Sequence, residues 1–320
     1  MLLERHLLTA IAALAFTTAF AADPYPTRPI RMVVGFAPGG GTDLTARPVA
    51  QKLSELMGQP VIVENRPGAG GNIATEQVAR AAPDGYTLLM GTIASLAISP
   101  GLYGNLRFDP ETDFAPIIQV VDATNVLALH PSVPANSVEE LIALARKGSL
   151  SAGSSGVAAT GHLSIELFNL MAGVKLVHVP YKGGAPAMGD LVGGQVHLIF
   201  ATAASAIPHI KSGRIKGIAV TTAKRSALLP ELPTISEAGL PGFDANNWYG
   251  LVAPAKTPRA IIDRLNAEVT KVLDIPEVKT TLFNQGLDPA PGTPEQFGAY
   301  IRSERIKWAK VIKESGAKAE

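Results

Sequence analysis

The segment from Arg31 to Arg47 constrains the fold of this chain more than any other stretch. It overlaps a short apolar run rich in β-branched residues, 30–34, and a glycine tetrapeptide follows closely at 38–41 (PGGG). Apolar residues then recur at helical spacing, at Ala46, Val49, Ala50, Leu53, Leu56 and Met57. The segment therefore predicts a buried strand, a tight glycine turn and a helix in direct succession.

The glycine turn is suited to receiving an anion. Gly39, Gly40 and Gly41 can adopt positive φ angles and carry no β-carbons, so their amide groups can point at a ligand above the helix start. Thr42 and Asp43 are helix-capping residue types and could compete with a ligand for those amides. A plain strand-to-helix turn without a ligand is the alternative interpretation of this motif.

Two nucleotide-binding motifs do not fit the turn. A Walker loop needs Lys followed by Ser or Thr directly after its last glycine, whereas Thr42 and Asp43 follow here and the next lysine is Lys52. A dinucleotide fingerprint that starts at Gly39 would need a glycine where Leu44 stands. We therefore expect neither a nucleoside triphosphate nor NAD, and no other cofactor is indicated.

Composition narrows the class of protein further. The chain has 320 residues, of which 47% are apolar and 17% charged, and this length favours two domains over one. A net charge of +1 argues against a nucleic-acid partner held by bulk electrostatics. The chain has no cysteine, which excludes disulfides, thiol chemistry and thiolate metal sites.

The first 21 residues have the pattern of a secretory signal peptide. An apolar run from Leu7 to Phe20 ends in an A-x-A cleavage motif at 19–21, so we expect cleavage after Ala21 or Ala22 and a periplasmic mature protein. Glu4 departs from the usual positive start, which leaves an uncleaved anchor as the alternative. A lipoprotein is excluded because it requires a cysteine.

Strand and helix patterns alternate after the first helix. A second short strand, a second glycine turn, a helix near 73–82 and a strand at 86–90 indicate a parallel sheet, and ligands of such sheets gather at the carboxyl ends of the strands. Thr92 and Ser95 follow the last of these strands, so we expect them near the Gly39 turn. Helix capping is the alternative role for both hydroxyls.

A second domain is predicted after a break near Asp122. Its small-residue loop carries Ser154, Ser155 and Thr160 and leads into a helix, which makes a second acceptor for a carboxylate. A serine hydrolase is a weak alternative, because a nucleophile elbow at Ser155 would need glycine where Val157 stands.

Histidines of the second domain do not form a recognisable site. His162 and Glu166 share a helix face, but a single pair is no metal site without further ligands. The other histidines show no paired spacing, so we expect structural roles for them and no bound metal.

Three further polar residues are candidates for ligand contacts in this domain. Lys182 adds a positive charge at a predicted loop, with an ordinary exposed lysine as the alternative. Tyr181 could equally be a core ring with a solvated hydroxyl. Thr202 lies at the end of the apolar strand 196–200, where a ligand would be expected.

Seven motifs together resemble the substrate receptors of tripartite tricarboxylate transporters, the Bug or TctC-type family. They are 25–30 (YPTRPI), 36–43 (FAPGGGTD), 63–71 (VENRPGAGG), 83–88 (PDGYTL), 179–184 (VPYKGG), 233–239 (PTISEAG) and 250–254 (GLVAP). The resemblance covers nearly the whole mature chain, and the motifs are specific as a set.

The resemblance implies an α/β fold of the two-lobed type II periplasmic binding protein kind, each lobe a mostly parallel sheet flanked by helices. Residues 22–122 and 245–320 would form lobe 1, and 123–244 lobe 2. It further implies a small organic acid held between the lobes, partly through ordered water. The candidate ligand contacts are Phe36, Gly39, Gly40, Gly41, Thr42, Asp43, Thr92, Ser95, Ser154, Ser155, Thr160, Tyr181, Lys182 and Thr202.

One departure from the family pattern bears on the ligand. Members often carry Val-Asp after the Gly-Gly-Gln turn, and some carry a second acid near the end of that strand, but here these places hold Val196-His197 and Phe200-Ala201. If the second acidic residue binds the ammonium group of a ligand in those members, its absence here disfavours an amino-acid ligand.

The sequence thus predicts a monomeric, non-enzymatic receptor that closes on a di- or tricarboxylate or an aromatic acid and delivers it to membrane permease subunits. A serine-type hydrolase of small esters, or a ligand sensor for a signalling partner, are the alternatives.

Overall fold

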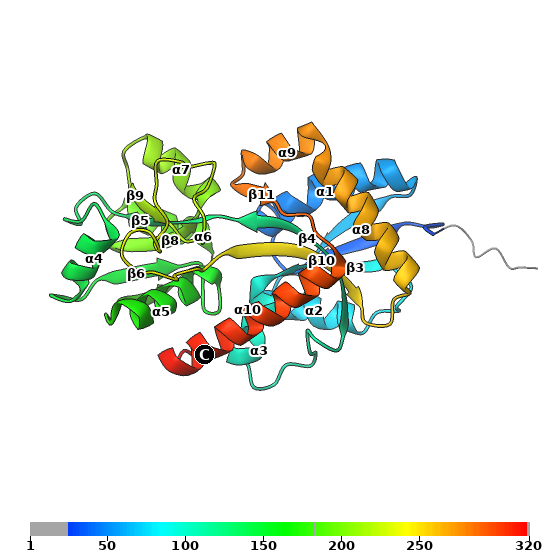
Figure 1. Ribbon diagram of the computed structural model, residues 1–320, viewed down its shortest axis with the longest axis horizontal. Helices are drawn as coiled ribbons and strands as arrows, with labels where there is room; N and C mark the ends of the chain where they lie inside the picture. Colours follow the sequence, from blue (N-terminus) through cyan, green and yellow to red (C-terminus); the bar gives the residue numbers. More distant parts are fainter. Residues whose placement is uncertain (1–24, 182, 319–320) are drawn as a thin grey trace, which may run out of the picture.

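A computed structural model shows two α/β lobes side by side, joined by long strands and by a helix that lies along both (Figure 1). The structure describes residues 25–181 and 183–318. The predicted signal peptide and Lys182 lie outside the described residues. Among the described residues, no helix is both long and apolar enough to cross a membrane.

Lobe 1 is built on a six-stranded sheet with the order β11-β4-β10-β3-β1-β2. β1 pairs in parallel with β2 and β3, whereas β10 is antiparallel to both β3 and β4, and β11 is antiparallel to β4. The strands are β1 (Ile30–Val34), β2 (Val61–Asn65), β3 (Thr87–Thr92), β4 (Phe114–Ala123), β10 (Asn247–Pro254) and β11 (Leu287–Pro289).

Lobe 2 is built on a five-stranded sheet with the order β7-β6-β8-β5-β9. β6 is parallel to β7 and β8, whereas β5 is antiparallel to β8 and β9. The strands are β5 (Asn125–Leu129), β6 (Ser151–Ser154), β7 (Val177–Pro180), β8 (Leu198–Thr202) and β9 (Lys216–Val220). The two-lobed α/β fold is as predicted, but both sheets are mixed rather than mostly parallel, because the chain crosses between lobes in strands that run against their neighbours.

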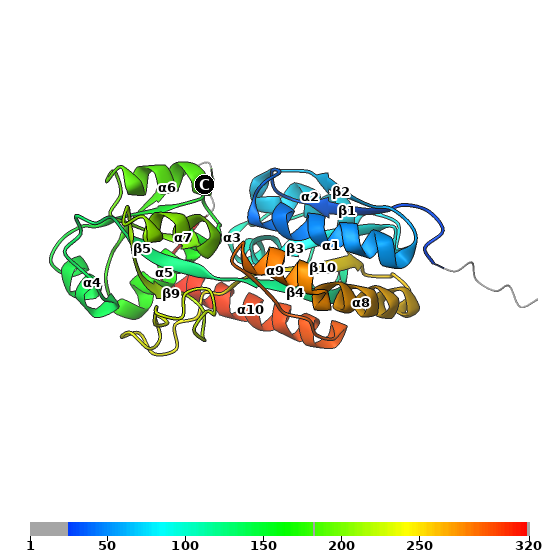
Figure 2. The ribbon, with the colours of Figure 1, turned by 90° about the horizontal axis from the view of Figure 1, so that it is seen from above.

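Helices cover the two sheets (Figures 1 and 2). In lobe 1 they are α1 (Gly41–Met57), α2 (Asn72–Ala79), α3 (Ser99–Leu102), α8 (Arg259–Asp274) and α9 (Pro276–Phe283), with short irregular turns η1 (Ala69–Gly71) and η2 (Ala94–Ile98). In lobe 2 they are α4 (Val138–Ala145), α5 (Thr160–Ala172), α6 (Gly184–Val192) and α7 (Ala203–Lys211). The last helix, α10 (Pro294–Ser315), contacts β4 of lobe 1 and α5 of lobe 2.

The strands of lobe 1 that carry candidate residues end at the junction between the lobes. β4 ends at Ala123 and β5 begins at Asn125, which marks the junction. β10 runs antiparallel to β4 with Asn247 opposite Ala123, and β3 runs antiparallel to β10 with Thr92 opposite Tyr249. Because β1 and β3 are parallel, the loop after β1 also lies at the junction.

The parallel strands of lobe 2 also end at the junction. Thr202, the last residue of β8, lies opposite Asn125, the first residue of β5. β6 is parallel to β8, and β7 to β6, so Ser154 and Pro180 end their strands at the same edge. The carboxyl ends of the parallel strands in both lobes therefore face the junction, where ligands of α/β sheets bind.

Candidate ligand-binding site

The N-terminus of α1 presents amide groups at the junction. The first hydrogen bond of the helix runs from the Leu44 amide to the Gly40 carbonyl at 2.9 Å, and no described side chain caps the helix start. The amides of Gly41, Thr42 and Asp43 thus precede the intrahelical ladder, as first-turn donors do. Figures 1 and 2 both show α1 starting on the side facing lobe 2 and running away from it.

Gly41 is required by close packing at this helix start. A β-carbon built on Gly41 would lie 2.7 Å from the Tyr249 hydroxyl oxygen, which no real contact permits. Tyr249 is buried on β10, and its hydroxyl accepts a hydrogen bond from the Asn247 side chain at 3.2 Å. The absence of a side chain at Gly41 therefore lets the first turn rest on the central strand.

Asp43 has a different role from the predicted ligand contact. Its carboxylate is only 2% exposed and accepts hydrogen bonds from the Gly39 amide, the Arg47 guanidinium and the Asn65 side chain, each at 2.9 Å. Burial alone would raise the pKa of Asp43, but these three donors outweigh it and hold the pKa below its usual value. Asp43 therefore shapes the loop, and it also occupies the Gly39 amide that was predicted to face the ligand.

Around the end of β3, Thr92 and Ser95 contact each other. Both are buried, the Ser95 amide donates to the Thr92 hydroxyl at 3.4 Å, and the Ser95 hydroxyl donates to the Thr92 carbonyl at 3.4 Å. Phe36 lies beside them, because a β-carbon built on Gly71 would lie 3.2 Å from the Phe36 ring and 3.8 Å from the Ser95 β-carbon. Phe36, Gly71 and Ser95 thus converge next to the glycine loop.

In lobe 2 the start of α5 is the counterpart of α1. Its first hydrogen bond runs from the Leu163 amide to the Ala159 carbonyl at 3.2 Å, and no side chain in the described part of the chain caps it. The amides of Thr160, Gly161 and His162 precede that bond and are first-turn donors. Thr160 is therefore placed, as predicted, at a helix start on the junction edge.

The two serines before this helix differ sharply. Ser155 is exposed. Ser154 is 2% exposed, its hydroxyl lies 2.6 Å from Nε2 of His178, and it also exchanges hydrogen bonds with the backbone of Gly156. Ser154 therefore holds the loop in place from within, while Ser155 is open to a ligand.

A pair of histidines beneath this loop was missed by the sequence argument. The rings of His162 and His178 are stacked, with centroids 4.1 Å apart and an interplanar angle of 14°. Nδ1 of His162 accepts a hydrogen bond from the Ala158 amide at 3.2 Å, and Nε2 lies 3.6 Å from a Glu166 carboxylate oxygen. Burial and the neighbouring His178 lower the pKa of His162 to about 4, and burial raises that of Glu166. Only the spacing of His162 and Glu166 was visible in the sequence, since His178 comes from another element.

Tyr181 and Thr202 are both engaged with the protein itself. The Tyr181 hydroxyl donates to the Asp190 carboxylate at 2.7 Å, which ties the segment after β7 to α6, and the predicted ligand contact of Tyr181 stays a prediction. Burial and Asp190 raise the pKa of Tyr181 to about 12. The Thr202 hydroxyl lies 3.0 Å from that of Ser205 at the start of α7.

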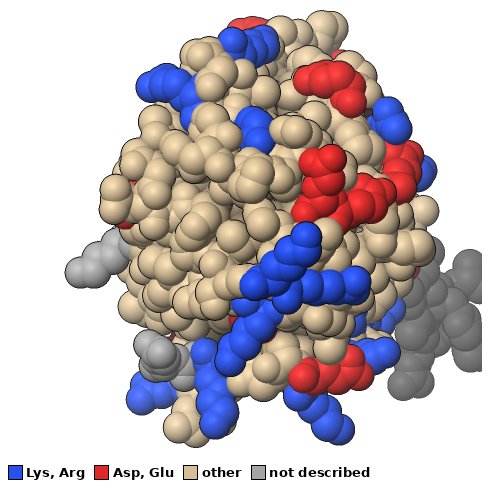
Figure 3. All heavy atoms as spheres, turned by 90° about the vertical axis from the view of Figure 1, so that its left-hand side faces the viewer, with Lys and Arg blue, Asp and Glu red and all other residues tan. Residues whose placement is uncertain are grey.

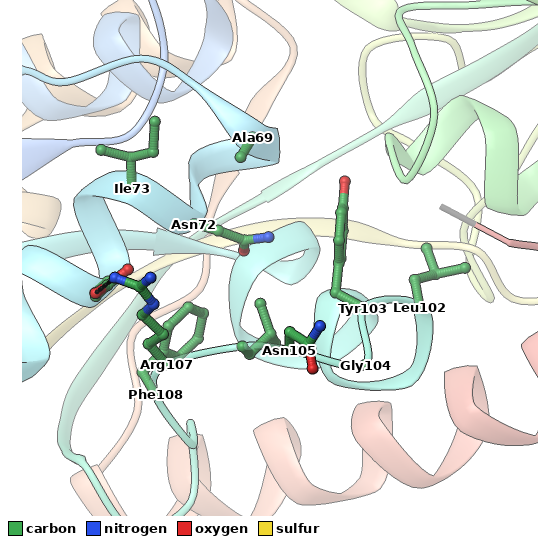
Figure 4. Close-up of a pocket in the computed structure, with 11 residues that line it drawn as sticks. Ala69, Asn72, Ile73, Leu102, Tyr103, Gly104, Asn105, Arg107 and Phe108 are labelled. Atoms are coloured by element: carbon green, nitrogen blue, oxygen red, sulfur yellow. Dashed lines mark ion pairs between the residues drawn. The ribbon is translucent and has the colours of Figure 1, made fainter. Parts of the chain in front are cut away.

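A pocket of about 350 Å³ opens in lobe 1 between α2 and the segment after α3 (Figure 4). None of the thirteen candidate residues that the structure describes lines it. Its lining residues are Ala69, Asn72, Ile73, Glu76, Leu102, Tyr103, Gly104, Asn105, Leu106, Arg107 and Phe108.

Charge on the described surface is mixed. The end of lobe 2 seen in Figure 3 carries both basic and acidic side chains, without a field of one sign. Within residues 25–181 and 183–318, no group of three His, Asp or Glu side chains could hold a metal ion.

Two sheets whose strand ends and helix N-termini meet at one junction define a two-lobed solute-binding protein. The model of the tripartite tricarboxylate transporter family receptor matches residues 45–317, so the chain belongs to that family of periplasmic binding proteins. Protein BugT of Bordetella pertussis is 38% identical over 311 residues, which is 96% of this chain and 95% of BugT.

Solved structures agree with this assignment. Rpa4515 of R. palustris with adipate is 40% identical, with a TM-score of 0.84 over 92% of this chain and 99% of that one. MatC of Rhodopseudomonas palustris with bound malate is 32% identical, with a TM-score of 0.80 over 90% of this chain and 100% of that one. The family model describes its members as receptors, and the two solved relatives hold adipate and malate respectively.

Proposed function

We propose that this protein captures a small organic carboxylate between its lobes and delivers it to the permease subunits of a tripartite transporter. The observation that carries the proposal is the pair of helix N-termini, α1 and α5, whose first-turn amides lack side-chain caps at facing sheet edges. Such helix starts bind carboxylates through their amides and dipole.

Energetics favour a site made by both lobes. One helix N-terminus contributes up to ~2 kcal/mol toward a partly buried anion. A micromolar receptor needs about −8 kcal/mol. Two helix starts, together with hydroxyls such as Ser155 and direct hydrogen bonds in a dry cleft, supply what one lobe does not. The ligand would then favour the closed arrangement, because only that arrangement has both halves of the site.

The adipate and malate in the related structures support a carboxylate as the ligand class. His197 and Ala201 stand where the family pattern places acids, which supports a ligand without an ammonium group. We propose that lobe 1 consists of residues 22–122 and 245–320, and lobe 2 of residues 123–244. A cleavable signal peptide is the proposed route to the periplasm, and the proposed oligomeric state is a monomer.

A thermal-shift screen of the mature protein against a panel of small carboxylic acids tests this function, because a ligand that binds only the folded state raises the melting temperature. We expect a large shift with some acids, and the acid recovered unchanged by chromatography. Absence of any shift across the panel at millimolar concentrations would contradict the proposal, and conversion of the acid or of its esters would instead favour the hydrolase alternative.

A further inference from the structure

The lobe 1 pocket is mostly apolar, and its polar lining residues include Asn72, Glu76 and Arg107. Side chains of Leu102, Leu106 and Phe108 form much of its lining. In Figure 4 the Asn72 amide points from α2 toward Tyr103, which stands on the opposite wall. A volume of about 350 Å³ is within the range of small-molecule sites.

Asn72 is the polar group that points to a ligand. Its side chain is only 7% exposed, and its Oδ1 atom is buried with no hydrogen-bond partner among the described residues. Leaving a buried acceptor unsatisfied costs about 1–3 kcal/mol. Since an amide can turn to exchange its oxygen and nitrogen, a ligand in the pocket could satisfy this group.

The charged groups beside the pocket form one cluster. Glu76 lies 2.8 Å from the Arg80 guanidinium and 3.8 Å from that of Arg107. One carboxylate thus serves two guanidinium groups, with the closer contact to Arg80. At the rim of the pocket, Ile73 is 54% exposed, which leaves apolar surface for a ligand to cover.

The pocket adjoins the candidate site through a short segment. Ala69 and Asn72 line the pocket, and Gly71 between them faces the Phe36 ring and Ser95 on the other side. One wall of the pocket is thus also a wall of the region next to the glycine loop and the α1 N-terminus.

We propose that this pocket receives the apolar body of the ligand, a ring or hydrocarbon chain, while the carboxylate lies at the helix N-termini. This inference rests on the proposed function and narrows its ligand to aromatic or medium-chain aliphatic carboxylates, as opposed to compact polyanions such as citrate. Asn72 would donate or accept a hydrogen bond at a polar substituent on that body.

Calorimetry with an acid series tests the ligand class. The series is benzoate, 3-phenylpropionate and octanoate against acetate, malate and citrate, with the full mature chain. We expect at least one of the three apolar acids to bind tenfold or more tightly than any of the compact ones. Tightest binding of malate or citrate would overturn the inference and leave the proposed function standing, whereas binding of none would overturn both.

Filling the pocket tests the location. Gly104 lines the pocket, and a β-carbon there meets nothing within 4 Å, so the first atom of the Gly104→Trp side chain has room. Gly148, equally exposed and open but in lobe 2, gives the matched control Gly148→Trp. Leu106→Trp fills the same pocket from a second position.

We expect Gly104→Trp and Leu106→Trp to weaken the apolar acids at least tenfold and to leave acetate unchanged, with Gly148→Trp like the wild type. Circular dichroism melting checks that each variant folds. Unchanged affinity for the apolar acids in both folded pocket variants would overturn the inference, and the acid series decides it if neither variant folds.

Discussion

At the scale of single residues, Asp43 shows how a motif residue can serve a loop instead of a ligand. Its carboxylate accepts hydrogen bonds from the Gly39 amide, Arg47 and Asn65, and these bonds fix the turn that precedes α1. The amides of the next residues are then left for an anion. A buried carboxylate is retained here because each of its charged oxygens has donors.

Replacing Asp43 by asparagine should destabilise the protein. One acceptor oxygen becomes a donor facing other donors, so we expect a loss of roughly 2 kcal/mol in the free energy of unfolding, measured with urea. Arg47→Ala should cost less, because Arg47 is exposed. Equal losses in the two variants would contradict the role given to the buried carboxylate.

Acidification should reduce this difference. The pKa of Asp43 is lowered in the folded protein, so its stabilisation is present above the ordinary value of 3.8 and is lost as the pH falls through the folded value. The gap between wild type and Asp43→Asn should therefore be widest near neutral pH and narrow below about pH 4.

At the scale of elements, the two uncapped helix starts are the central feature of the molecule. α1 follows β1 in lobe 1 and α5 follows β6 in lobe 2, each through a short loop that contains glycine. Small residues are needed because neighbours approach closely: a β-carbon on Gly161 would lie 2.9 Å from the Phe200 carbonyl. The first turns can therefore come near a ligand without side chains in between.

Two glycine-to-alanine variants test whether binding depends on the close packing at Gly41 or on any glycine near the start of α1. Gly41→Ala places a β-carbon 2.7 Å from the buried Tyr249 hydroxyl, whereas Gly40→Ala meets only the Ala37 carbonyl at 3.5 Å, with an ordinary φ of −82°. We expect Gly41→Ala to weaken binding of the best acid at least tenfold by displacing the first turn. Gly40→Ala should stay within threefold in calorimetry, and similar effects of both would argue against the packing explanation.

At the scale of the whole molecule, the lobes share a junction of strands, a core and one helix. One cluster of buried apolar side chains extends from Leu89 of lobe 1 to Phe168 of lobe 2 and includes Trp308 of α10. α10 lies along both lobes, so it belongs structurally to each (Figure 1). Any closure must occur around this shared base.

Partly buried carboxylates at the junction make stability depend on pH. Asp122 lies opposite Asp288 in the sheet and accepts hydrogen bonds from Gln119 at 2.7 Å and Asn246 at 2.5 Å. Burial, with smaller contributions from Asp288 and Asp244, raises the pKa of Asp122 to about 6. The folded state therefore holds this proton more tightly than the unfolded state.

Asp122 should stabilise the fold fully below its ordinary pKa of 3.8 and lose that contribution as the pH rises through about 6. The slope is at most about 1.4 kcal/mol per pH unit between the two values. His162, with its lowered pKa, acts in the opposite direction, so the readout is the difference between wild type and Asp122→Asn in urea unfolding from pH 4 to 8. A difference that does not change with pH would contradict the raised pKa.

Local sequence determined much of this protein. The glycine turns and the strand-loop-helix units follow from residue types a few positions apart, because backbone conformation is set locally by φ freedom and apolar spacing. The family motifs added the two-lobed arrangement, which the structure confirms.

Tertiary structure alone decided which groups meet. The contacts of Gly41 with Tyr249, Ser154 with His178 and Asp122 with Asn246 join residues far apart in the chain, and the mixed strand order arises from the crossings between lobes. No local pattern specifies such partners, since they depend on how distant elements pack. The local sequence therefore determined that amide groups lie at the glycine turn and at the helix starts. The packing of the lobes determined which of these amides can still bind a ligand.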